Sequence, residues 1–356
     1  MRLMIAGGGT GGHVFPGLAV AGEVARREPS SEIVFVGTER GLEARLMPKA
    51  GYRVEFLRVG GLKGVSVGTR LSTLRALPAS VWQSFSLLLR YRPQVVLGVG
   101  GYASGPTMLA AALAGYPTVL FEPNAKPGLA NRILRPFVKH AAVNFEEAEH
   151  YFGAKAVRTG CPVRPEFVGI GPREHRPPFN ILIFGGSQGA LAINQAMIEA
   201  LDFFRVRAEE LIFVHQTGER DYNAVRVGYA RRGMRAEVLA FIDNMAERFA
   251  AADLVISRAG AVTVAELTAT GKAALLIPFP HATDQHQLRN ARALKRAGAA
   301  RVIEQSELDG ERLASAVFDL MDHPKEIETI EQNARRLGRP DAAARIVDLL
   351  EKVRKP

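Results

Sequence analysis

Short apolar runs alternate with longer segments of helical periodicity along most of the chain. The runs lie at residues 3–6, 33–36, 54–57, 95–99, 118–121 and 141–143, and again at 181–184, 211–216, 237–240, 254–257, 274–277 and 300–303. This alternation is typical of parallel sheets whose strands are joined by crossover helices. The pattern therefore predicts an α/β fold built from doubly wound sheets.

A glycine-rich segment follows the first apolar run of each half. Gly8-Gly9-Thr10-Gly11-Gly12 and Gly185-Gly186-Ser187-Gln188-Gly189 begin 177 residues apart (185 − 8), about half of the 356-residue chain. The repeating unit is therefore a whole domain, and we predict two Rossmann-like domains facing a central cleft that holds the ligand. Glycine turns before a helix expose amides to phosphate, although the same turns also serve as plain tight connections.

A proline-rich segment separates the two halves. Gly160-Cys161-Pro162-Val163-Arg164-Pro165 is followed by Pro172, Pro177 and Pro178, and so many prolines exclude one continuous helix. We predict an N-terminal domain over residues 1–163 and a C-terminal domain over 164–339. Residues 340–356 carry an amphipathic helix that is able to pack on either domain.

The amino-acid composition limits the classes of partner and the kinds of site that are expected. The chain has 46 Lys and Arg against 36 Asp and Glu, a net charge of +10, which favours anionic partners such as nucleotides, phospholipids or nucleic acid. The single Cys161 excludes an intramolecular disulfide and a cysteine-based zinc cluster, in keeping with a reducing cytosol. Gly7 interrupts the first apolar run and no run reaches the roughly 18 residues of a spanning helix, so neither a signal peptide nor a membrane span is expected.

Polar and glycine-rich motifs fall at the carboxyl ends of the predicted strands, where doubly wound sheets bind their ligands. Neither glycine segment has the Gly-x-Gly-x-x-Gly spacing followed by the acidic residue of a nicotinamide site, which disfavours a dehydrogenase. The motifs span residues 8–13, 98–106, 122–124, 185–189, 241–245, 257–263 and 281–290.

Five of these motifs, in this order, resemble the MurG family of bacterial glycosyltransferases. They are Gly-Gly-Thr-Gly-Gly-His-Val-Phe-Pro-Gly (8–17), Gly-Gly-Tyr-Ala-Ser-Gly-Pro (100–106), Gly-Gly-Ser-Gln-Gly-Ala (185–190), Ser-Arg-Ala-Gly-Ala-Val-Thr-Val-Ala-Glu (257–266) and Asp-Gln-His-Gln (284–287). The resemblance implies a GT-B fold with an acceptor-side N-terminal domain and a donor-side C-terminal domain. Phe121-Glu122-Pro123-Asn124 departs from the family pattern, and Cys161 stands where the family usually has asparagine.

The resemblance also implies a reaction. N-acetylglucosamine passes from UDP-N-acetylglucosamine to the C4 hydroxyl of the N-acetylmuramoyl group of lipid I, with inversion and without metal or cofactor, and lipid II is formed. No Asp-x-Asp motif, the usual diphosphate-metal motif of the other large glycosyltransferase fold, occurs in the chain. A peripheral enzyme on the cytoplasmic face of the plasma membrane is expected. It would have no nucleic-acid partner and could contact other proteins of cell-wall precursor synthesis or of the divisome.

Departing diphosphate needs hydrogen-bond donors. We expect Ser187, Gln188 and Gly189 to open a helix, so their amides and the Ser187 hydroxyl are candidates, and Arg164 could add a bidentate contact. Ser187 could instead be an ordinary helix cap, and Arg164 could form a surface ion pair.

Other donor contacts follow from the resemblance. Glu266 would accept hydrogen bonds from the ribose diol, or be a solvated helical glutamate. Ile242 would offer its backbone to the uracil edge. Asp284, His286 and Gln287, together with Asn124, would bind the sugar, although the first three could simply cap the next helix.

His13 is the candidate general base, since an imidazole titrates near neutral pH and lies beside the first glycine loop. A capping or core histidine is the alternative. Further acceptor-side contacts are expected from Thr10, Gly11, Gly12, Tyr102, Ser104, Glu122 and Asn124. Pro123 lacks a backbone donor, which weakens the expected role of Glu122.

A basic amphipathic segment would serve membrane binding. Leu62, Lys63, Arg70 and Arg75 are the predicted contacts. Most of the apolar stripe from Leu71 to Leu89 could instead pack on its own sheet. Two other functions stay open: another GT-B enzyme, such as a diacylglycerol glycosyltransferase or a UDP-sugar epimerase, and a nucleotide-sugar binding protein without turnover.

Overall fold

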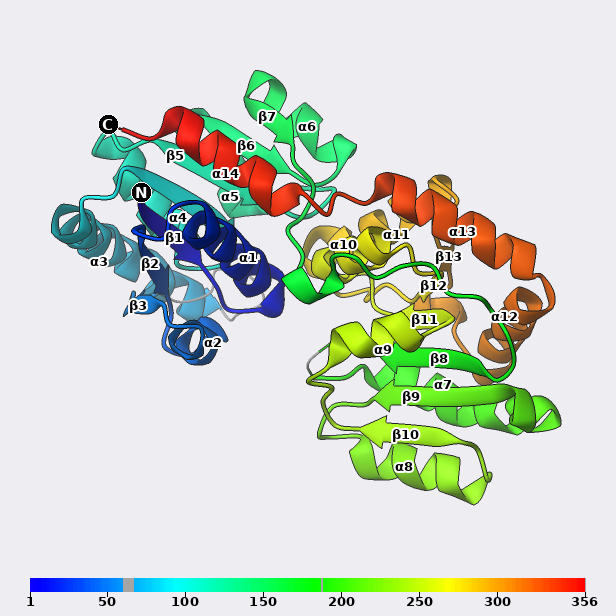
Figure 1. Cartoon of the computed structure of the whole chain (residues 1–356). Coiled ribbons are helices and arrows are strands. Elements are labelled where there is room, and N and C mark those ends of the chain that lie inside the picture. The colour runs from blue at the N-terminus through cyan, green and yellow to red at the C-terminus, as the bar shows by residue number, and fades with distance from the viewer. Residues whose placement is uncertain (60–66, 187, 356) are drawn as a thin grey trace. The chain divides into compact units, whose positions relative to one another are not determined.

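The computed structural model describes residues 1–59, 67–186 and 188–355, with the backbone alone over 67–76. The chain forms two compact units (Figure 1). One consists of Met1–Pro165 together with Arg339–Pro356, and the other of Glu166–Gly338. The chain thus crosses between units at 165/166 and returns at 338/339.

The first unit contains a parallel sheet in the order β3-β2-β1-β4-β5-β6-β7. Its strands are β1 (Arg2–Gly7), β2 (Glu32–Gly37), β3 (Arg53–Phe56), β4 (Val95–Gly100), β5 (Thr118–Glu122), β6 (His140–Val143) and β7 (Ala156–Arg158). The central strands β4 and β5 are buried along their whole length, as expected for a sheet covered by helices on both faces. The register of β1 and β4 shifts between Ala6 and Gly7, where both strands reach their glycine loops.

The second unit repeats the design with the order β10-β9-β8-β11-β12-β13, again parallel at each described pair. Its strands are β8 (Phe179–Phe184), β9 (Leu211–Gln216), β10 (Ala236–Leu239), β11 (Leu254–Ser257), β12 (Ala274–Leu276) and β13 (Arg301–Val302). In each sheet the strand order reverses beside the first strand, β1 or β8, which carries the glycine loop. Such a reversal is the usual ligand position of a doubly wound sheet.

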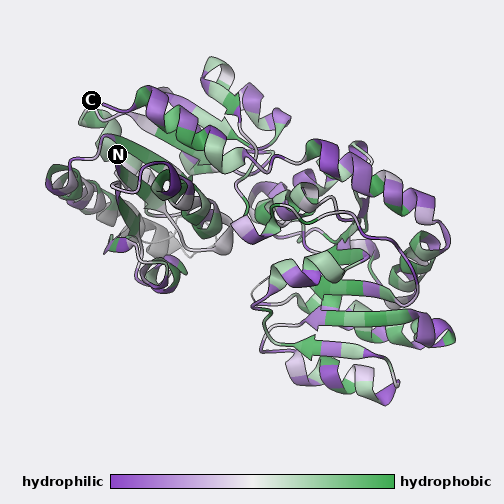
Figure 2. Ribbon diagram, in the orientation of Figure 1, coloured by the Kyte–Doolittle hydropathy of each residue, from purple (hydrophilic) through white to green (hydrophobic). Residues whose placement is uncertain are grey.

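Helices connect the strands. In the first unit they are α1 (Gly11–Arg27), α2 (Glu43–Lys49), α3 (Val67–Tyr91), α4 (Ser104–Leu113), α5 (Leu129–Leu134), α6 (Glu146–Phe152) and α14 (Ala342–Val353). In the second they are α7 (Leu191–Phe204), α8 (Tyr222–Arg231), α9 (Met245–Ala251), α10 (Ala261–Thr270), α11 (His286–Arg296), α12 (Gly310–Asp322) and α13 (Pro324–Leu337). Figure 2 shows mainly hydrophobic strands and helices with one polar side, the pattern that buries an apolar face of each helix against a sheet.

The C-terminal helix α14 belongs to the first unit and packs against α1. Arg27 of α1 donates to Asp348 at 2.6 Å and to the carbonyl oxygen of Ala344 at 3.1 Å. Ile346, Val347 and Leu350 of α14 are fully buried. The last segment of the chain therefore completes the domain that the first residues begin.

The α/β class and every predicted strand are confirmed. The sequence missed β7, because this three-residue edge strand is only partly buried and has no apolar run to mark it. Helix α1 begins at Gly11, so Pro16 lies inside it. A proline there leaves the carbonyl oxygen of Gly12 without its helical donor. In the described part of the chain, no helix combines the length and apolar character needed to span a bilayer.

Candidate functional site

The first glycine loop packs tightly on the end of β4. The Gly8 amide donates to the carbonyl oxygen of Gly100 at 3.1 Å. A side chain at Gly101 would overlap the carbonyl oxygen of Gly8, and one at Gly7 would overlap that of Gly100. These positions also have positive φ angles, which glycine adopts without strain. The glycines thus bring the ends of β1 and β4 together.

His13 lies in the first turn of α1 and is half-buried. Its Nδ1 is 3.1 Å from the carbonyl oxygen of Gly8 and 3.4 Å from Oγ1 of Thr10. A carbonyl oxygen only accepts hydrogen bonds, so the contact with Gly8 places a proton on Nδ1. In the neutral ring Nε2 is then the nitrogen that can accept a proton. His13 is therefore not a wholly buried core histidine.

The second segment of the first unit's site follows β4. Tyr102 is 54% exposed, so its ring is available to a ligand. Ser104 is instead 1% exposed, and its hydroxyl has no hydrogen-bond partner among the described residues. This burial favours a packing role for the Ser104 side chain, beneath Gly98.

Glu122, at the end of β5, is buried and bonded to its own loop. Its Oε1 accepts from Asn124 N–H at 3.0 Å and from the Asn124 side chain at 3.2 Å. Its Oε2 accepts from Gly128 N–H at 3.0 Å and from Asn131 at 2.9 Å. Burial raises the pKa of Glu122, although these hydrogen bonds oppose the rise. Both oxygens serve residues 124–131, so Glu122 orders the loop that presents Asn124. Pro123 fits this loop, since no bond to Glu122 needs its missing donor.

Arg164 stacks on an aromatic ring. Its guanidinium carbon lies 5.1 Å from the ring centroid of Phe15 in α1. This distance is within the range of a cation–π contact. The contact joins the segment after β7 to the first helix of the same unit.

The second glycine loop precedes its helix and does not open it. Helix α7 begins at Leu191 with Ala190 as its N-cap residue, so the expectation that residues 187–189 start the helix is wrong. The Gly189 amide donates to the carbonyl oxygen of Gly186 at 3.0 Å. Gly189 also crosses Thr217 so closely that a side chain would overlap the Thr217 carbonyl oxygen. Gln188 is exposed, whereas Ser187 lies outside the described residues.

Gln216 was not predicted as a site residue. Its side-chain nitrogen donates to the Gly186 carbonyl oxygen at 2.8 Å, and its side-chain oxygen accepts from Ile242 N–H at 2.8 Å. The residue is 2% exposed and links the loop after β8 to the loop after β10. The N–H of Ile242 is therefore already hydrogen-bonded within the protein. The position of Gln216 at the carboxyl end of an apolar run was the available sequence signal.

Two charged side chains are buried in the segment that follows β11. Glu266 of α10 is 4% exposed, so it is not a solvated helical glutamate. Arg258 is 8% exposed and donates to the Ile277 carbonyl oxygen at 3.1 Å. Its guanidinium carbon lies 5.3 Å from the Phe279 ring centroid, and burial lowers the pKa of Arg258 to about 10. Arg258 is a second residue that the sequence did not single out for this site.

The loop after β12 has an unusual backbone. Asp284 and Gln285 have φ angles of 54° and 55°, a left-handed conformation that costs energy for residues other than glycine. His286 Nδ1 lies 2.7 Å from the Thr283 carbonyl oxygen, and burial lowers the pKa of this imidazole. Gln287 accepts from Phe279 N–H at 3.0 Å, so it holds the loop together.

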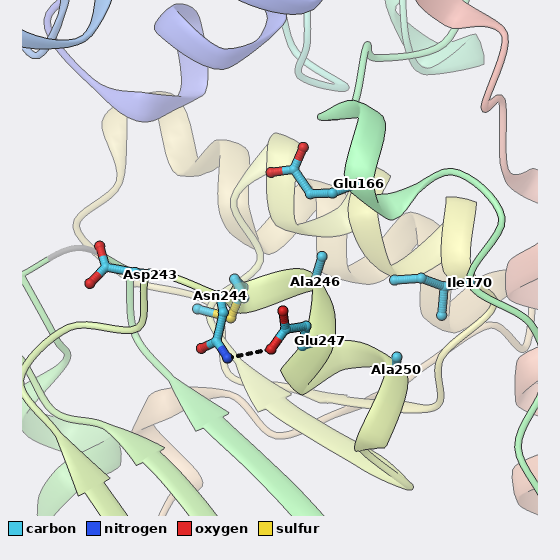
Figure 3. A pocket seen from close by; sticks show the side chains of 8 residues that line it. Glu166, Ile170, Asp243, Asn244, Ala246, Glu247 and Ala250 are labelled. Carbon is cyan, nitrogen blue, oxygen red and sulfur yellow. Dashed lines mark hydrogen bonds between the residues drawn. The ribbon is translucent and has the colours of Figure 1, made fainter. Parts of the chain in front are cut away.

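A cavity of about 290 Å³ lies in the second unit near the loop after β10 (Figure 3). Glu166 and Ile170 line it from the segment before β8. Asp243 and residues 244–247 and 250, of the loop after β10 and of α9, line it from the other side. In the wall of this cavity the Asn244 side-chain amide donates a hydrogen bond to the Glu247 carboxylate at 2.6 Å. Its acidic lining suits a cation better than a diphosphate, and Ile242 is absent from it.

The predicted membrane contacts cannot be placed. Leu62 and Lys63 lie outside the described residues, as do the side chains of Arg70 and Arg75. In the rest of α3, Leu87 and Leu88 are buried, which confirms that part of the stripe packs inward. Trp82 and Leu89 are 75% and 71% exposed.

His215 has a structural role in the second unit. It is fully buried, with Nε2 3.0 Å from Oδ1 of Asn194, and burial lowers its pKa to about 3. Within the described residues, no group of three or more histidine, cysteine or acidic side chains could hold a metal ion.

Comparison with known proteins covers both units. The glycosyltransferase family 28 N-terminal domain matches residues 3–143, and the C-terminal domain of the same family matches residues 180–346. A Myxococcus xanthus protein is 51% identical over 98% of this chain and 92% of its own length. A Geobacter protein is 46% identical over 98% of this chain and 95% of its own. Both are named UDP-N-acetylglucosamine--N-acetylmuramyl-(pentapeptide) pyrophosphoryl-undecaprenol N-acetylglucosamine transferase.

The crystal structure of Acinetobacter baumannii MurG is similar over 99% of each chain, with a TM-score of 0.80 and 32% identity. The calicheamicin glycosyltransferase CalG4 shares the fold with a TM-score of 0.69 at 17% identity, over 99% of this chain and 98% of its own. The two Rossmann-like units thus form a GT-B glycosyltransferase fold, and the chain belongs to the MurG family within glycosyltransferase family 28.

Proposed function

We propose that this chain transfers N-acetylglucosamine from UDP-N-acetylglucosamine to lipid I, undecaprenyl-diphospho-N-acetylmuramoyl-pentapeptide, and forms lipid II. The names of relatives that are 46% to 51% identical over 98% of the chain support both substrates. The observation on this chain that carries the proposal is the orientation of His13. With Nδ1 directed at the Gly8 carbonyl oxygen, its Nε2 is the nitrogen that can take a proton.

The reaction is an inverting displacement. The C4 hydroxyl oxygen of the acceptor forms a bond to C1 of the donor sugar, and the bond from C1 to the β-phosphate oxygen breaks. UDP departs with that electron pair, and the hydroxyl proton passes to Nε2 of His13 as general base. Thr10, Gly11, Gly12, Tyr102 and Asn124 would contact the acceptor, with Ser104 and Glu122 shaping the loops that carry them.

Most of the residues expected to bind the donor lie in the second unit, whereas Arg164 and Asn124 belong to the first, and no divalent cation would take part. Gln188, Ser187 and Arg164 would donate to the diphosphate, and stacking of Arg164 on Phe15 supports such a role. Glu266, in the helix that follows β11, would accept hydrogen bonds from the ribose diol, and its burial holds the carboxylate in one position. The Ile242 carbonyl would face uracil. The left-handed turn at Asp284 and Gln285 and the start of α11 would present Asp284, His286 and Gln287 to the sugar, with Asn124.

The test is an acceptor comparison. Purified protein is supplied with UDP-N-acetylglucosamine and lipid I, diacylglycerol or no acceptor, and released UDP and lipid products are measured. We expect UDP release and lipid II formation only when lipid I is the acceptor. A chelator should change neither rate. Formation of a glycosylated diacylglycerol, or of the C2 epimer of the donor, would contradict the proposal that lipid I is the acceptor. Loss of turnover with the chelator would contradict metal independence.

We further propose a peripheral position on an anionic cytoplasmic membrane surface, where lipid I would be reached. Lys63, Arg70 and Arg75 would supply charge and Leu62 an apolar contact. Exposure of Trp82 and Leu89, further along α3, supports an apolar contribution from the same helix.

A further inference from the structure

Glu43 is a fully buried carboxylate beside the first glycine loop. It is the first residue of α2 and has no exposed surface. Its Oε1 accepts from Thr38 N–H at 2.8 Å and from the Thr38 hydroxyl at 3.0 Å, and its Oε2 accepts from Gly9 N–H at 2.6 Å. Both oxygens act as acceptors and the bond to Gly9 is short, the arrangement of an ionised carboxylate with charge-assisted bonds.

Three glycines leave room for this carboxylate. A side chain at Gly8, Gly37 or Gly41 would in each case overlap the Glu43 side chain. These glycines come from the loop after β1, the end of β2 and the turn before α2. The fold therefore encloses the carboxylate from three segments, and its position is fixed by backbone.

The bond to Gly9 leads directly to His13. The N–H of Gly9 and the carbonyl of Gly8 belong to one peptide unit. Glu43 accepts from the N–H end of that unit at 2.6 Å, and the carbonyl end lies 3.1 Å from Nδ1 of His13. One amide thus joins the carboxylate to the imidazole, with no side chain between them.

We propose that Glu43 is a positioning residue for His13 and acts through the Gly8–Gly9 peptide. The negative charge polarises the amide and increases the electron density on the Gly8 carbonyl oxygen, since hydrogen bonds in a chain strengthen one another. That oxygen then holds the proton of His13 on Nδ1, keeps Nε2 as the acceptor nitrogen and stabilises the imidazolium that forms. In hydrolases with a Ser-His-Asp triad a carboxylate bonded directly to histidine has this task. The inference rests on the proposed role of His13 as general base.

The first experiment uses the isosteric variant Glu43→Gln, which keeps the shape and removes the charge. We expect kcat for lipid II formation to fall about 10- to 100-fold, as for other residues that orient an active group, while KM for UDP-N-acetylglucosamine changes less than about twofold. Glu43→Asp restores the charge and should recover part of kcat. The matched control is Glu331→Gln, which neutralises another buried carboxylate, 6% exposed, in the second unit and should retain kcat.

The second experiment observes the imidazole. In ¹⁵N-histidine-labelled protein, NMR should show His13 as the Nδ1–H tautomer in the unmodified protein and a tautomer mixture in Glu43→Gln. The measurement on the unmodified protein does not depend on whether the variant folds. A mainly Nε2–H tautomer there would overturn the inference.

The outcomes separate the inference from the proposed function. If His13→Ala keeps full activity, the general base itself is misassigned. If His13→Ala is inactive while Glu43→Gln keeps both kcat and the Nδ1–H tautomer, the peptide-mediated link alone is overturned.

Discussion

The side-chain oxygen of Gln216 accepts the backbone N–H of Ile242 at 2.8 Å, and through this bond a residue at the end of β9 fixes the loop after β10. The other end of the same side chain holds the Gly186 carbonyl oxygen. Two loops proposed to bind UDP therefore share one buried amide.

Replacing Gln216 by Leu should weaken donor binding. Leucine has a similar volume but leaves the Ile242 N–H and the Gly186 carbonyl without their partner, and each unsatisfied buried group costs about 1–3 kcal/mol. We expect the Kd for UDP, measured by calorimetry, to rise about tenfold. Gln94→Leu is the control, since Gln94 bonds to Arg2 and Lys355 in the first unit. Equal affinities in the two variants would contradict the role of Gln216.

Replacing His13 by Ala should lower turnover without loss of donor binding. General base catalysis contributes about 10²- to 10⁴-fold, so kcat for lipid II formation should fall within that range. The Kd for UDP should stay within about twofold. His150→Ala, on α6 of the same unit, is the control and should retain kcat. An equal fall in kcat for both variants would indicate that the protein had lost its fold, and would not support His13 as the general base.

A cluster of ionisable side chains in the second unit should make the free energy of unfolding depend on pH. His175 Nδ1 is hydrogen-bonded to Oδ1 of Asp253 at 3.0 Å, and Nε2 lies 3.3 Å from Oε2 of Glu331; these two carboxylates raise the pKa of His175 to about 9 from 6.5. The Asp253 pKa is lowered: burial raises it, but bonds from His175 and Asn180 and the charge of Arg173 outweigh burial. Lys272 of the same region is buried as well.

The sign follows from the raised pKa of His175. Its folded pKa exceeds its unfolded pKa, so its contribution is complete below about pH 6.5 and is lost as the pH rises through about 9. Near pH 6, His175→Gln should lower the free energy of unfolding by on the order of 2–3 kcal/mol, and the deficit should shrink by pH 10. Urea unfolding at several pH values measures this. His323→Gln, at a histidine with 63% side-chain exposure, should show no such dependence. A deficit that is constant with pH would contradict the charged state of His175.

Charge reversal near the start of α3 should reduce membrane binding. In the triple variant Lys63→Glu, Arg70→Glu and Arg75→Glu, flotation with phosphatidylglycerol vesicles should decrease, because each basic residue near an anionic surface contributes about 1 kcal/mol. The control reverses three exposed arginines of the second unit, Arg220, Arg226 and Arg231, with the same change in net charge. If both variants float like the unmodified protein, the membrane contact lies elsewhere.

The order of strands and helices could be predicted because it depends on neighbouring residues. Apolar runs such as 211–216 and 254–257 became strands with the predicted bounds, and the glycine segments mark the turns after β1 and β8. Among the strands of the described residues, β7 alone was not predicted, since its three edge residues are at most partly buried and produce no periodic pattern. The placement of motifs at strand ends followed from the same local pattern.

The hydrogen bonds of the site could not be predicted, because they join residues far apart along the chain. Glu43 and Gly9 are 34 residues apart, and Gln216 and Ile242 are 26 apart. Adjacent parallel strands bring such residues to one edge of the sheet, and burial there favours pairing of the backbone donors with acceptors. The chain's periodicity and glycine spacing thus determined the fold and the region of the site. The tertiary structure decided which amides are committed internally, which carboxylates are buried and which nitrogen of His13 carries the proton, since these depend on contacts that only the folded sheet creates.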